Sequence, residues 1–365
     1  MTTAGLGAVR PASERDVLRA AFDLLRQRMP PEWSFAVAQD QRVGRSQADA
    51  VLHLRSPDGA EAVVVIEAKT VLEARDVASV RDQLALTESA MPGSTGMVVA
   101  RYLAKSVRDR LADSGVSYAD ATGNLLIRIT RPGLYIADRG ADRDPWRGPG
   151  RPRGTLKGEP AAKVVRALVD EPWPWKVTDL IAASKVSTGS VYRVVDYLEA
   201  EALVVRDGEG RITVPDWSAL LRRWSEDYQF LRTNAVSRWI APRGIDALLS
   251  QITGGAEDAY AVTGTIAAAE RAAYAPARNA MIYVADAARA ANAWGLRATE
   301  SGVNVLLAEP AYPFVLNQPD ERSDGLKVVK PSQAVVDLLT GPGRSPSEAE
   351  ELMEWMRVNE DSWRR

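Results

Sequence analysis

Residues 161–217 constrain the fold more than any other stretch, because their pattern predicts three helices and a hairpin in a fixed order. Apolar residues recur at helical spacing in AAKVVRALVD. Two further helices are indicated by VTDLIAAS and STGSVYRVVDYLEAEAL, with only the turn KVS between them. Ser187 is placed to cap the third helix. The segment LVVRDGEGRITV then predicts a hairpin around Asp-Gly-Glu-Gly.

Three helices and a hairpin at these spacings predict a winged helix-turn-helix over residues 159–217. In that arrangement the start of the third helix enters the major groove, while Val191, Val194, Val195 and Leu198 face the core. The wing arginines contact phosphate. The residues expected to bind DNA are Ser187, Thr188, Ser190, Tyr192 and Arg193 on the helix and Arg206 and Arg211 beside the wing. A winged helix that binds protein instead is the alternative.

The preceding residues, 142–158, have no apolar period and are rich in Gly, Pro and Arg, so they are expected to be a linker. Within it, GRPRG resembles an AT-hook, which would place Arg151 and Arg153 in a narrow minor groove. A hinge whose charge serves only solubility explains the same residues.

Toward the N-terminus, the apolar run AVVVIEAKT ends on Glu67 and Lys69. Together with SQADAVLHLR and the turn SPDG it predicts a hairpin of two strands. Alternation places Asp49 and His53 on one face of the first strand, and Glu67 and Lys69 on one face of the second. We therefore expect Asp49 to converge with the Glu67–Lys69 pair at one end of the sheet.

Two carboxylates with an ammonium beside them suit metal-dependent cleavage of a phosphodiester. Asp49 and Glu67 would hold Mg²⁺ with several waters left in place, which would polarise the phosphate and help to generate hydroxide. Lys69 would stabilise the developing charge or orient the attacking water. Most of the 46 basic residues are arginine, so a lysine at this position indicates a need for its compact, tunable charge. The alternative is a purely structural ion pair between Glu67 and Lys69 at the end of the strand.

Asp49 followed by Glu67-x-Lys69 after a hairpin resembles the pattern of PD-(D/E)xK nucleases, which have the restriction-endonuclease-like fold. The resemblance implies an α/β domain over residues 1–141. It also implies supporting roles for Glu14 on the first helix (SERDVLRAAFDLLRQRM) and for Gln83 on the next helix (VRDQLALTESAM). An inherited fold that serves only packing or DNA contact is the alternative. For His53 and for the turn in YADATGNLLI, a structural role is the favoured interpretation.

Composition narrows the chemistry further. A chain of 365 residues predicts two or three domains. It has no cysteine, and His53 is its only histidine, which excludes thiolate nucleophiles and multi-histidine metal sites. There is no P-loop and no dinucleotide-binding glycine motif. The sequence also lacks a secretion signal and an apolar run that could cross a bilayer, so a cytoplasmic location without membrane association is expected.

Residues 218–365 alternate helical and strand patterns, which predicts a C-terminal α/β domain with an interaction role. Across residues 155–358, several stretches resemble AbiEi antitoxins of abortive-infection (type IV toxin–antitoxin) systems. These stretches are TLKGEPAAKVVRAL, GSVYRVVDYLEAEALV, DWSALLRRWSEDY, AVTGTIAAAERAAYAPARNAMIYV and PSQAVVDLLTGPGRSP. The resemblance implies binding to operator repeats and a nucleotidyltransferase toxin as partner. A homodimer that binds repeated half-sites is expected. The nuclease-like N-terminal domain departs from the short antitoxins of this type.

Two functions follow from these patterns. The first is a sequence-specific, homodimeric, antitoxin-like regulator that binds double-stranded DNA. The second is a Mg²⁺-dependent endodeoxyribonuclease that the winged helix directs to its site, in phage defence or DNA processing.

Overall fold

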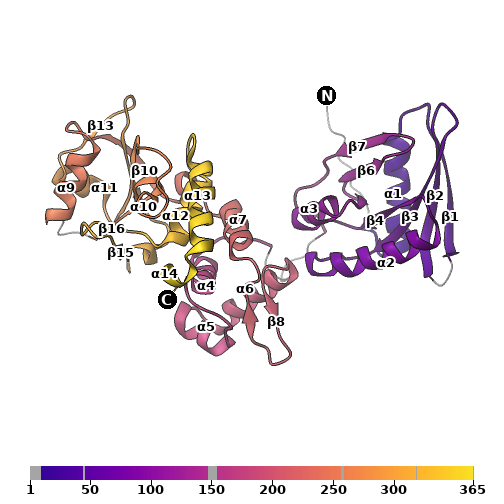
Figure 1. Cartoon of the computed structure of the whole chain (residues 1–365), viewed down its shortest axis with the longest axis horizontal. Coiled ribbons are helices and arrows are strands. Elements are labelled where there is room, and N and C mark those ends of the chain that lie inside the picture. Colours follow the sequence, from indigo (N-terminus) through magenta and orange to yellow (C-terminus); the bar gives the residue numbers. More distant parts are fainter. Residues whose placement is uncertain (1–9, 44–45, 147–153, 256–258, 318, 365) are drawn as a thin grey trace. The chain divides into compact units, whose positions relative to one another are not determined.

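The structure, a computed structural model, describes residues 10–43, 46–146, 154–255, 259–317 and 319–364. It is a mixed α/β protein with one large mixed sheet in its N-terminal part, another in its C-terminal part and a helical middle region (Figure 1). The chain forms two compact units, one of Met1–Arg151 with Ala200–Ala202 and one of Pro152–Glu199 with Leu203–Arg365. The expected α/β class is confirmed at this level.

The first unit contains a seven-stranded sheet in the order β1-β2-β3-β4-β5-β6-β7. Its strands are β1 (Ser34–Val43), β2 (Ser46–Arg55), β3 (Glu61–Lys69), β4 (Ser94–Ala100), β5 (Ser117–Asp120), β6 (Leu125–Ile129) and β7 (Leu134–Asp138). Its helices are α1 (Glu14–Arg28), η1 (Ala74–Asp76), α2 (Val77–Ala90) and α3 (Lys105–Asp113). The predicted hairpin is confirmed as β2–β3, but β1 was missed by the sequence analysis.

Two hydrophobic cores lie on opposite faces of this sheet. Helix α1 packs on one face, where alternate residues of β3 such as Val64 and Ile66 are buried. Helices α2 and α3 cover the other face, to which Val65 of β3 belongs. Ser13 caps α1 in a capping box with Asp16. Because β3 is buried on both faces, only its end can carry charged groups toward solvent.

The second unit opens with α4 (Glu159–Asp170), α5 (Val177–Ser184), α6 (Thr188–Ala200) and the small hairpin of β8 (Val205–Arg206) and β9 (Ile212–Thr213). These elements reproduce the predicted order of three helices and a hairpin. The turn from α5 to α6 is tight because Lys185 takes a left-handed conformation with φ 53°. Val191, Val194, Val195 and Leu198 of α6 are all fully buried, as expected.

Beyond the hairpin, a second seven-stranded sheet has the order β13-β10-β14-β12-β11-β16-β15. Its strands are β10 (Ala235–Ile240), β11 (Tyr260–Thr263), β12 (Ala280–Val284), β13 (Arg297–Ala298), β14 (Val305–Glu309), β15 (Asp320–Glu321) and β16 (Lys327–Val328). The helices are α7 (Trp217–Asp227), α8 (Phe230–Thr233), α9 (Ile245–Gly255), α10 (Gly264–Ala268), α11 (Ala287–Ala293), η2 (Pro313–Leu316), α12 (Pro331–Leu339), α13 (Ser345–Val358) and α14 (Glu360–Trp363).

One continuous hydrophobic core runs through this second unit, from Leu156 to Trp363. The end of the described chain is part of it. Arg364 lies over the ring of Trp173 at 4.0 Å and donates from Nε to the carbonyl of Val169 at 3.0 Å. Trp363 packs edge-on against Trp217. The helical middle region and the C-terminal sheet are therefore joined by packing as well as by chain connectivity.

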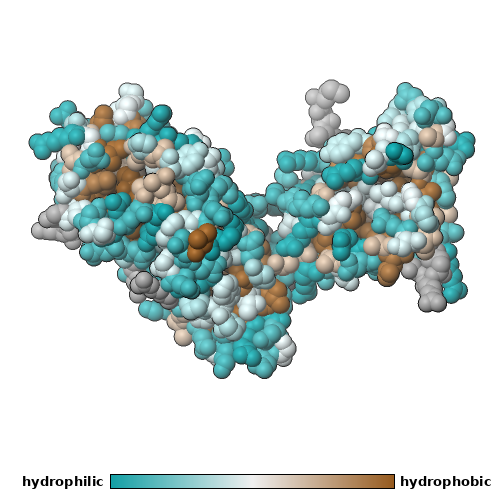
Figure 2. Space-filling view, in the orientation of Figure 1, coloured by the Kyte–Doolittle hydropathy of each residue, from teal (hydrophilic) through white to brown (hydrophobic). Residues whose placement is uncertain are grey.

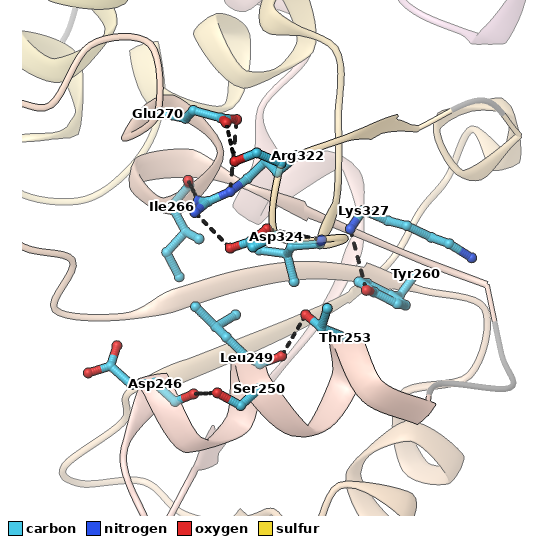
Figure 3. A network of polar contacts seen from close by, with 12 residues as sticks. Asp246, Leu249, Ser250, Thr253, Tyr260, Ile266, Glu270, Arg322, Asp324 and Lys327 are labelled. Carbon is cyan, nitrogen blue, oxygen red and sulfur yellow. Dashed lines mark hydrogen bonds and ion pairs between the residues drawn. The ribbon is translucent and has the colours of Figure 1, made fainter.

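The β15–β16 hairpin is held by Arg322, which donates to the carbonyl of Ile266 and pairs with Asp324, each at 3.0 Å (Figure 3). In the same view the backbone N–H of Lys327 donates to the hydroxyl of Tyr260 at 3.4 Å. On the face shown in Figure 2, polar residues cover most of each unit, with small apolar patches between them. No helix within the described ranges is long and apolar enough to cross a membrane.

Candidate functional site

The end of β3 brings together three of the predicted site residues. Nζ of Lys69 donates to Oε1 of Glu67 at 2.5 Å. From α2, Nε2 of Gln83 donates to the same oxygen at 3.0 Å. The Glu67 side chain is 6 % exposed, while that of Lys69 is 32 % exposed. Glu67 is therefore a buried carboxylate held from two sides, with its lysine partner closer to solvent.

Asp49 joins this group through the backbone of β3. The β2–β3 ladder includes the pair Ala50 and Ile66. One residue before Ala50 on β2, Oδ2 of Asp49 accepts the backbone N–H of Ala68 at 2.7 Å. The side chain thus replaces a ladder hydrogen bond and lies beside Glu67, as the alternation of the two strands predicted.

Charges in the site act on one another. Burial raises the pKa of the Glu67 carboxyl, and the negative charge of Asp49 adds to this effect, while the hydrogen bond from Lys69 opposes it. Burial alone would lower the pKa of Lys69. The hydrogen bond and charge of Glu67, with the charges of Asp49 and Glu14, outweigh burial, so that the pKa of Lys69 is raised. Lys69 is therefore an ammonium at neutral pH, which makes it a cation in the site and not a base.

Glu14 is the first residue of α1 and is exposed. It lies near enough for its charge to act on Lys69. Among the described residues, it forms no hydrogen bond or ion pair with the other four members of the predicted site. The structure thus brings Asp49, Glu67, Lys69 and Gln83 into a tight cluster, with Glu14 at its margin.

The oxygen donors of this cluster fit a magnesium ion. Oδ1 of Asp49 and Oε2 of Glu67 accept no hydrogen bond from the part of the chain that the structure describes, so each carboxylate has one oxygen available. Mg²⁺ is commonly held by one or two carboxylates with waters and substrate phosphate completing its shell. No group of three or more His, Asp or Glu side chains in the described ranges is arranged to hold a metal ion. A protein cage of carboxylates is thus not present, but a two-carboxylate Mg²⁺ site is chemically suited to these residues.

The second predicted surface is the N-terminal end of α6. Ser187 precedes the helix, and its hydroxyl bonds to that of Ser190 at 3.1 Å instead of to a backbone N–H. Arg193 also donates to Ser190, at 3.0 Å. Ser187, Thr188, Tyr192 and Arg193 are exposed, and Ser190 is partly exposed. These side chains form a polar surface of hydroxyl groups and one guanidinium.

The β8–β9 hairpin, which the sequence predicts to be the wing, differs from this surface because its arginines are already paired with acids. Arg206 pairs with Asp196 and, at 3.6 Å, with Glu199. Arg211 pairs with Asp207 at 3.3 Å and with Glu209. Phosphate would have to compete with these carboxylates, which the sequence analysis did not anticipate. Arg151 and Arg153 of the linker lie outside the described residues.

The turn in YADATGNLLI connects β5 and β6, as the structural interpretation predicted. Asp120 is fully buried and accepts hydrogen bonds from the backbone of Leu103, Thr122 and Asn124 and from the side chains of Thr122 and Asn124. All of its donors come from neighbouring loops. The hydrogen bonds of the Asp120 carboxylate therefore give it a structural role.

In the second unit, the strand-end and helix acids Asp286 and Glu309 also have structural partners. Asp286 caps α11, and Glu309 accepts the backbone N–H of Ala287 at 2.9 Å. Asp337 is fully buried and accepts from Thr263, Tyr283 and Gln333. Burial raises the pKa of the Asp337 carboxyl to about 7. No sequence motif pointed to this network, because its members come from separate elements.

Sequence reasoning missed one feature of the first unit. A cavity of about 320 Å³ is lined partly by Gln41 and Arg42 of β1, by His53 of β2 and by Met91. The available signal was the strand β1 (SFAVAQDQRV), whose polar second half QDQRV obscured the strand pattern.

No protein-family model, curated protein or solved structure matches this chain.

Proposed function

We propose that this chain is a DNA-binding regulator of the antitoxin type that recognises double-stranded DNA with the N-terminal end of α6. The composition of that end carries the proposal: Ser187, Thr188, Tyr192 and Arg193 are exposed, and none of them is acidic. Hydroxyl and guanidinium groups are the donors and acceptors that read base edges in the major groove. The buried face of α6 fixes their direction, because its apolar residues are packed in the core.

The test is binding to a DNA site selected from a random-sequence pool, followed by fluorescence anisotropy. Arg193→Ala is expected to weaken binding to the selected site by roughly 1–3 kcal/mol and to relax its sequence preference. Arg243→Ala is the matched control, because Arg243 is equally exposed and lies in a turn of the same unit. Binding without sequence preference, or equal losses in both variants, would overturn this function.

The resemblance to AbiEi antitoxins extends the proposal to partners. A homodimer would bind two half-sites, and a nucleotidyltransferase toxin would bind the same protein. Sedimentation velocity with DNA carrying one or two copies of the selected site tests the first expectation. Co-expression with the product of any neighbouring nucleotidyltransferase gene tests the second. A protein that stays monomeric on both DNAs would count against the dimer.

A second candidate function is a Mg²⁺-dependent endodeoxyribonuclease, favoured by the clustering of Asp49, Glu67, Lys69 and Gln83. The order α1-β1-β2-β3-α2-β4, with β3 parallel to β4, also supports a restriction-endonuclease-like core. Such a core places one acid on the second strand and the E-x-K pair on the third. The residues suit the chemistry whether or not the winged helix selects the site of cleavage.

In this candidate function, Asp49 and Glu67 would bind Mg²⁺, which would polarise the scissile phosphate and lower the pKa of a bound water. Lys69, held as an ammonium by its raised pKa, would stabilise the negative charge that develops on the phosphate. Gln83 would keep Oε1 of Glu67 engaged, so that Oε2 faces the ion. Each role belongs to a group that is already fixed by a hydrogen bond or by burial.

The test combines cleavage with metal binding. Wild type with Mg²⁺ should nick supercoiled DNA and cut linear DNA, and Lys69→Ala should abolish both reactions. Mg²⁺ should also raise the unfolding temperature of wild type, because a ligand that binds only the folded state stabilises it. Glu67→Gln should lose that shift, whereas Glu61→Gln, an exposed acid at the other end of β3, should keep it. Cleavage that survives in Lys69→Ala would exclude this function.

A further inference from the structure

A cavity in the first unit is lined by residues of β1 and β2 and by the end of α2. It is lined by Ala38, Gln41 and Arg42 of β1, by Val51 and His53 of β2, and by Met91 at the end of α2. Its volume of about 320 Å³ lies at the low end of the range for small-molecule sites, about 300–1,000 Å³. That is room for one small molecule or one nucleotide, and too little for a base pair.

Val51, which lines the cavity, lies two residues from Asp49 along β2. Side chains two residues apart on a strand share a face, so Asp49, Val51 and His53 follow one another on the same side of β2. Each step of two residues is about 7 Å. On β1, Ala38 lies opposite Val51 and Arg42 lies opposite Gln47, so Arg42 is placed beyond the Asp49 end of this row. A nucleic-acid strand whose phosphate is bound at Asp49 would therefore place its next nucleotide at the cavity.

The lining combines apolar walls with cationic and hydrogen-bonding groups. Ala38, Val51 and Met91 provide apolar surface, and the soft thioether of methionine packs well against flat rings. Arg42 and His53 are exposed. Gln41 donates to the carbonyl of Gln39 at 2.8 Å, which leaves its own amide oxygen for a ligand. Among the lining residues whose side chains the structure describes, none is acidic.

We propose that this cavity holds one unpaired nucleotide of the nucleic-acid strand that lies across Asp49 and Glu67. The base lies against Val51 and Met91, its phosphate contacts Arg42, and His53 lies at the other end of the cavity. A base can enter such a space only when it is unstacked and unpaired, and least energy is needed where the substrate already leaves it so. The preferred substrate class is therefore DNA with an unpaired nucleotide next to the scissile phosphate. The inference rests on the proposed nuclease site and specifies its substrate.

The experiment measures binding of the full-length chain in EDTA, so that it does not depend on cleavage. The probes are a fluorescein-labelled duplex with a single-nucleotide bulge and the fully paired duplex of the same sequence, followed by fluorescence anisotropy. Wild type should bind the bulged duplex several-fold more tightly. Arg42→Ala and His53→Ala should each reduce that preference. Ala38→Leu should abolish it by filling the cavity without a change of charge. Arg19→Ala is the matched control, because Arg19 is an exposed arginine on α1, which covers the opposite face of the sheet.

Equal affinity of wild type for the two duplexes would overturn the inference. So would a preference that survives both Arg42→Ala and Ala38→Leu. If Ala38→Leu fails to fold, Arg42→Ala still tests the inference, because the exposed Arg42 side chain can be removed without loss of folding. A second experiment measures cleavage with Mg²⁺ by wild type and by Asp49→Asn. It tests the nuclease proposal separately from the proposed binding site. Absence of cleavage by wild type, with the bulge preference intact, would reject the nuclease and keep the binding site.

Discussion

The carboxylate of Asp49 serves the fold and the proposed chemistry with different oxygens. Oδ2 accepts the N–H of Ala68, a fully buried residue of β3. A buried N–H without an acceptor is costly. Oδ1 is the oxygen that remains for a metal ion. Substitutions at this one position can therefore separate the structural role from the functional role.

Asp49→Ala should lower the free energy of unfolding by about 1–3 kcal/mol, because it leaves the Ala68 N–H without its acceptor. Asp49→Asn keeps an oxygen for that N–H and should retain most of the stability, yet lose the stabilisation by Mg²⁺. Urea unfolding of both variants with and without Mg²⁺ measures the two effects. If the two variants are equally unstable, the hydrogen bond is not what Asp49 contributes to the fold.

Asp337 makes stability depend on pH. Its pKa is about 7 in the folded protein, against an ordinary value of 3.8, so the folded state retains a proton that the unfolded state releases. The resulting stabilisation is fully present below pH 3.8 and is lost as pH rises to about 7. The contribution amounts to at most about 4 kcal/mol. Asp337→Asn should flatten this part of the profile in urea unfolding between those pH values. An unchanged slope would mean that other groups cause it.

At the level of elements, Gly140 lets the chain pass close to the β5–β6 turn. A Cβ at this position would lie 2.3 Å from the carbonyl oxygen of Thr122 and 2.5 Å from the backbone nitrogen of Asn124. Both are backbone atoms that a side-chain rotation cannot move. The turn holds the fully buried Asp120, so its displacement would disturb the end of β5.

Gly140→Ala is expected to destabilise the first unit by about 1–3 kcal/mol, the usual cost of overpacking. Gly133→Ala is the matched control, because the nearest atom to a Cβ there is 4.0 Å away. Thermal unfolding followed by circular dichroism compares the two. Equal stability of the two variants would show that the segment at Gly140 can move aside.

The wing leads to a prediction opposite to that of most basic surfaces. Arg211 is paired with Asp207 and Glu209, so removal of an acid should release the arginine for phosphate. Glu209→Gln should therefore bind DNA more tightly and show a steeper dependence of log K on log salt concentration. Anisotropy titrations over a range of salt concentrations measure both. A slope identical to that of wild type would place the wing away from DNA.

Some elements were easier to predict from sequence than others, for physical reasons. Helix α6 has periodic burial, and β3 is a nearly continuous apolar run that ends on charged residues, so a pattern of residues reveals both. Strand β1 is at the edge of its sheet, where polar residues such as Gln39 and Gln41 remain exposed and weaken the alternation. Strand β10 was missed for a similar reason, since all of its residues keep some exposure. The Asp49 cluster was predictable because alternation brings its residues together, whereas the Asp337 network depends on tertiary packing alone.

At the level of the whole molecule, the two units have separate hydrophobic cores. The first has two cores that flank its sheet, and the second has a single core that extends from Leu156 to Trp363. Units without a shared core are expected to unfold separately. The helical middle region and the C-terminal sheet, in contrast, should unfold together.

Calorimetry of the full-length chain should thus show two transitions. Gly140→Ala and Mg²⁺ should shift only the transition of the first unit, in opposite directions, while Asp337→Asn should shift only the other. A single transition that moves with every one of these changes would show that the units are energetically coupled.

The contact between Arg364 and α4 also sets an order of events during synthesis. Val169, which accepts a hydrogen bond from Arg364, leaves the ribosome 195 residues earlier than its partner. At a translation rate of about 5–20 residues per second, that interval is roughly 10–40 s. Throughout it, α4 lacks the arginine that contacts Val169 and covers Trp173. The helical middle region therefore acquires this part of its packing only when the segment around Trp363 and Arg364 has been made.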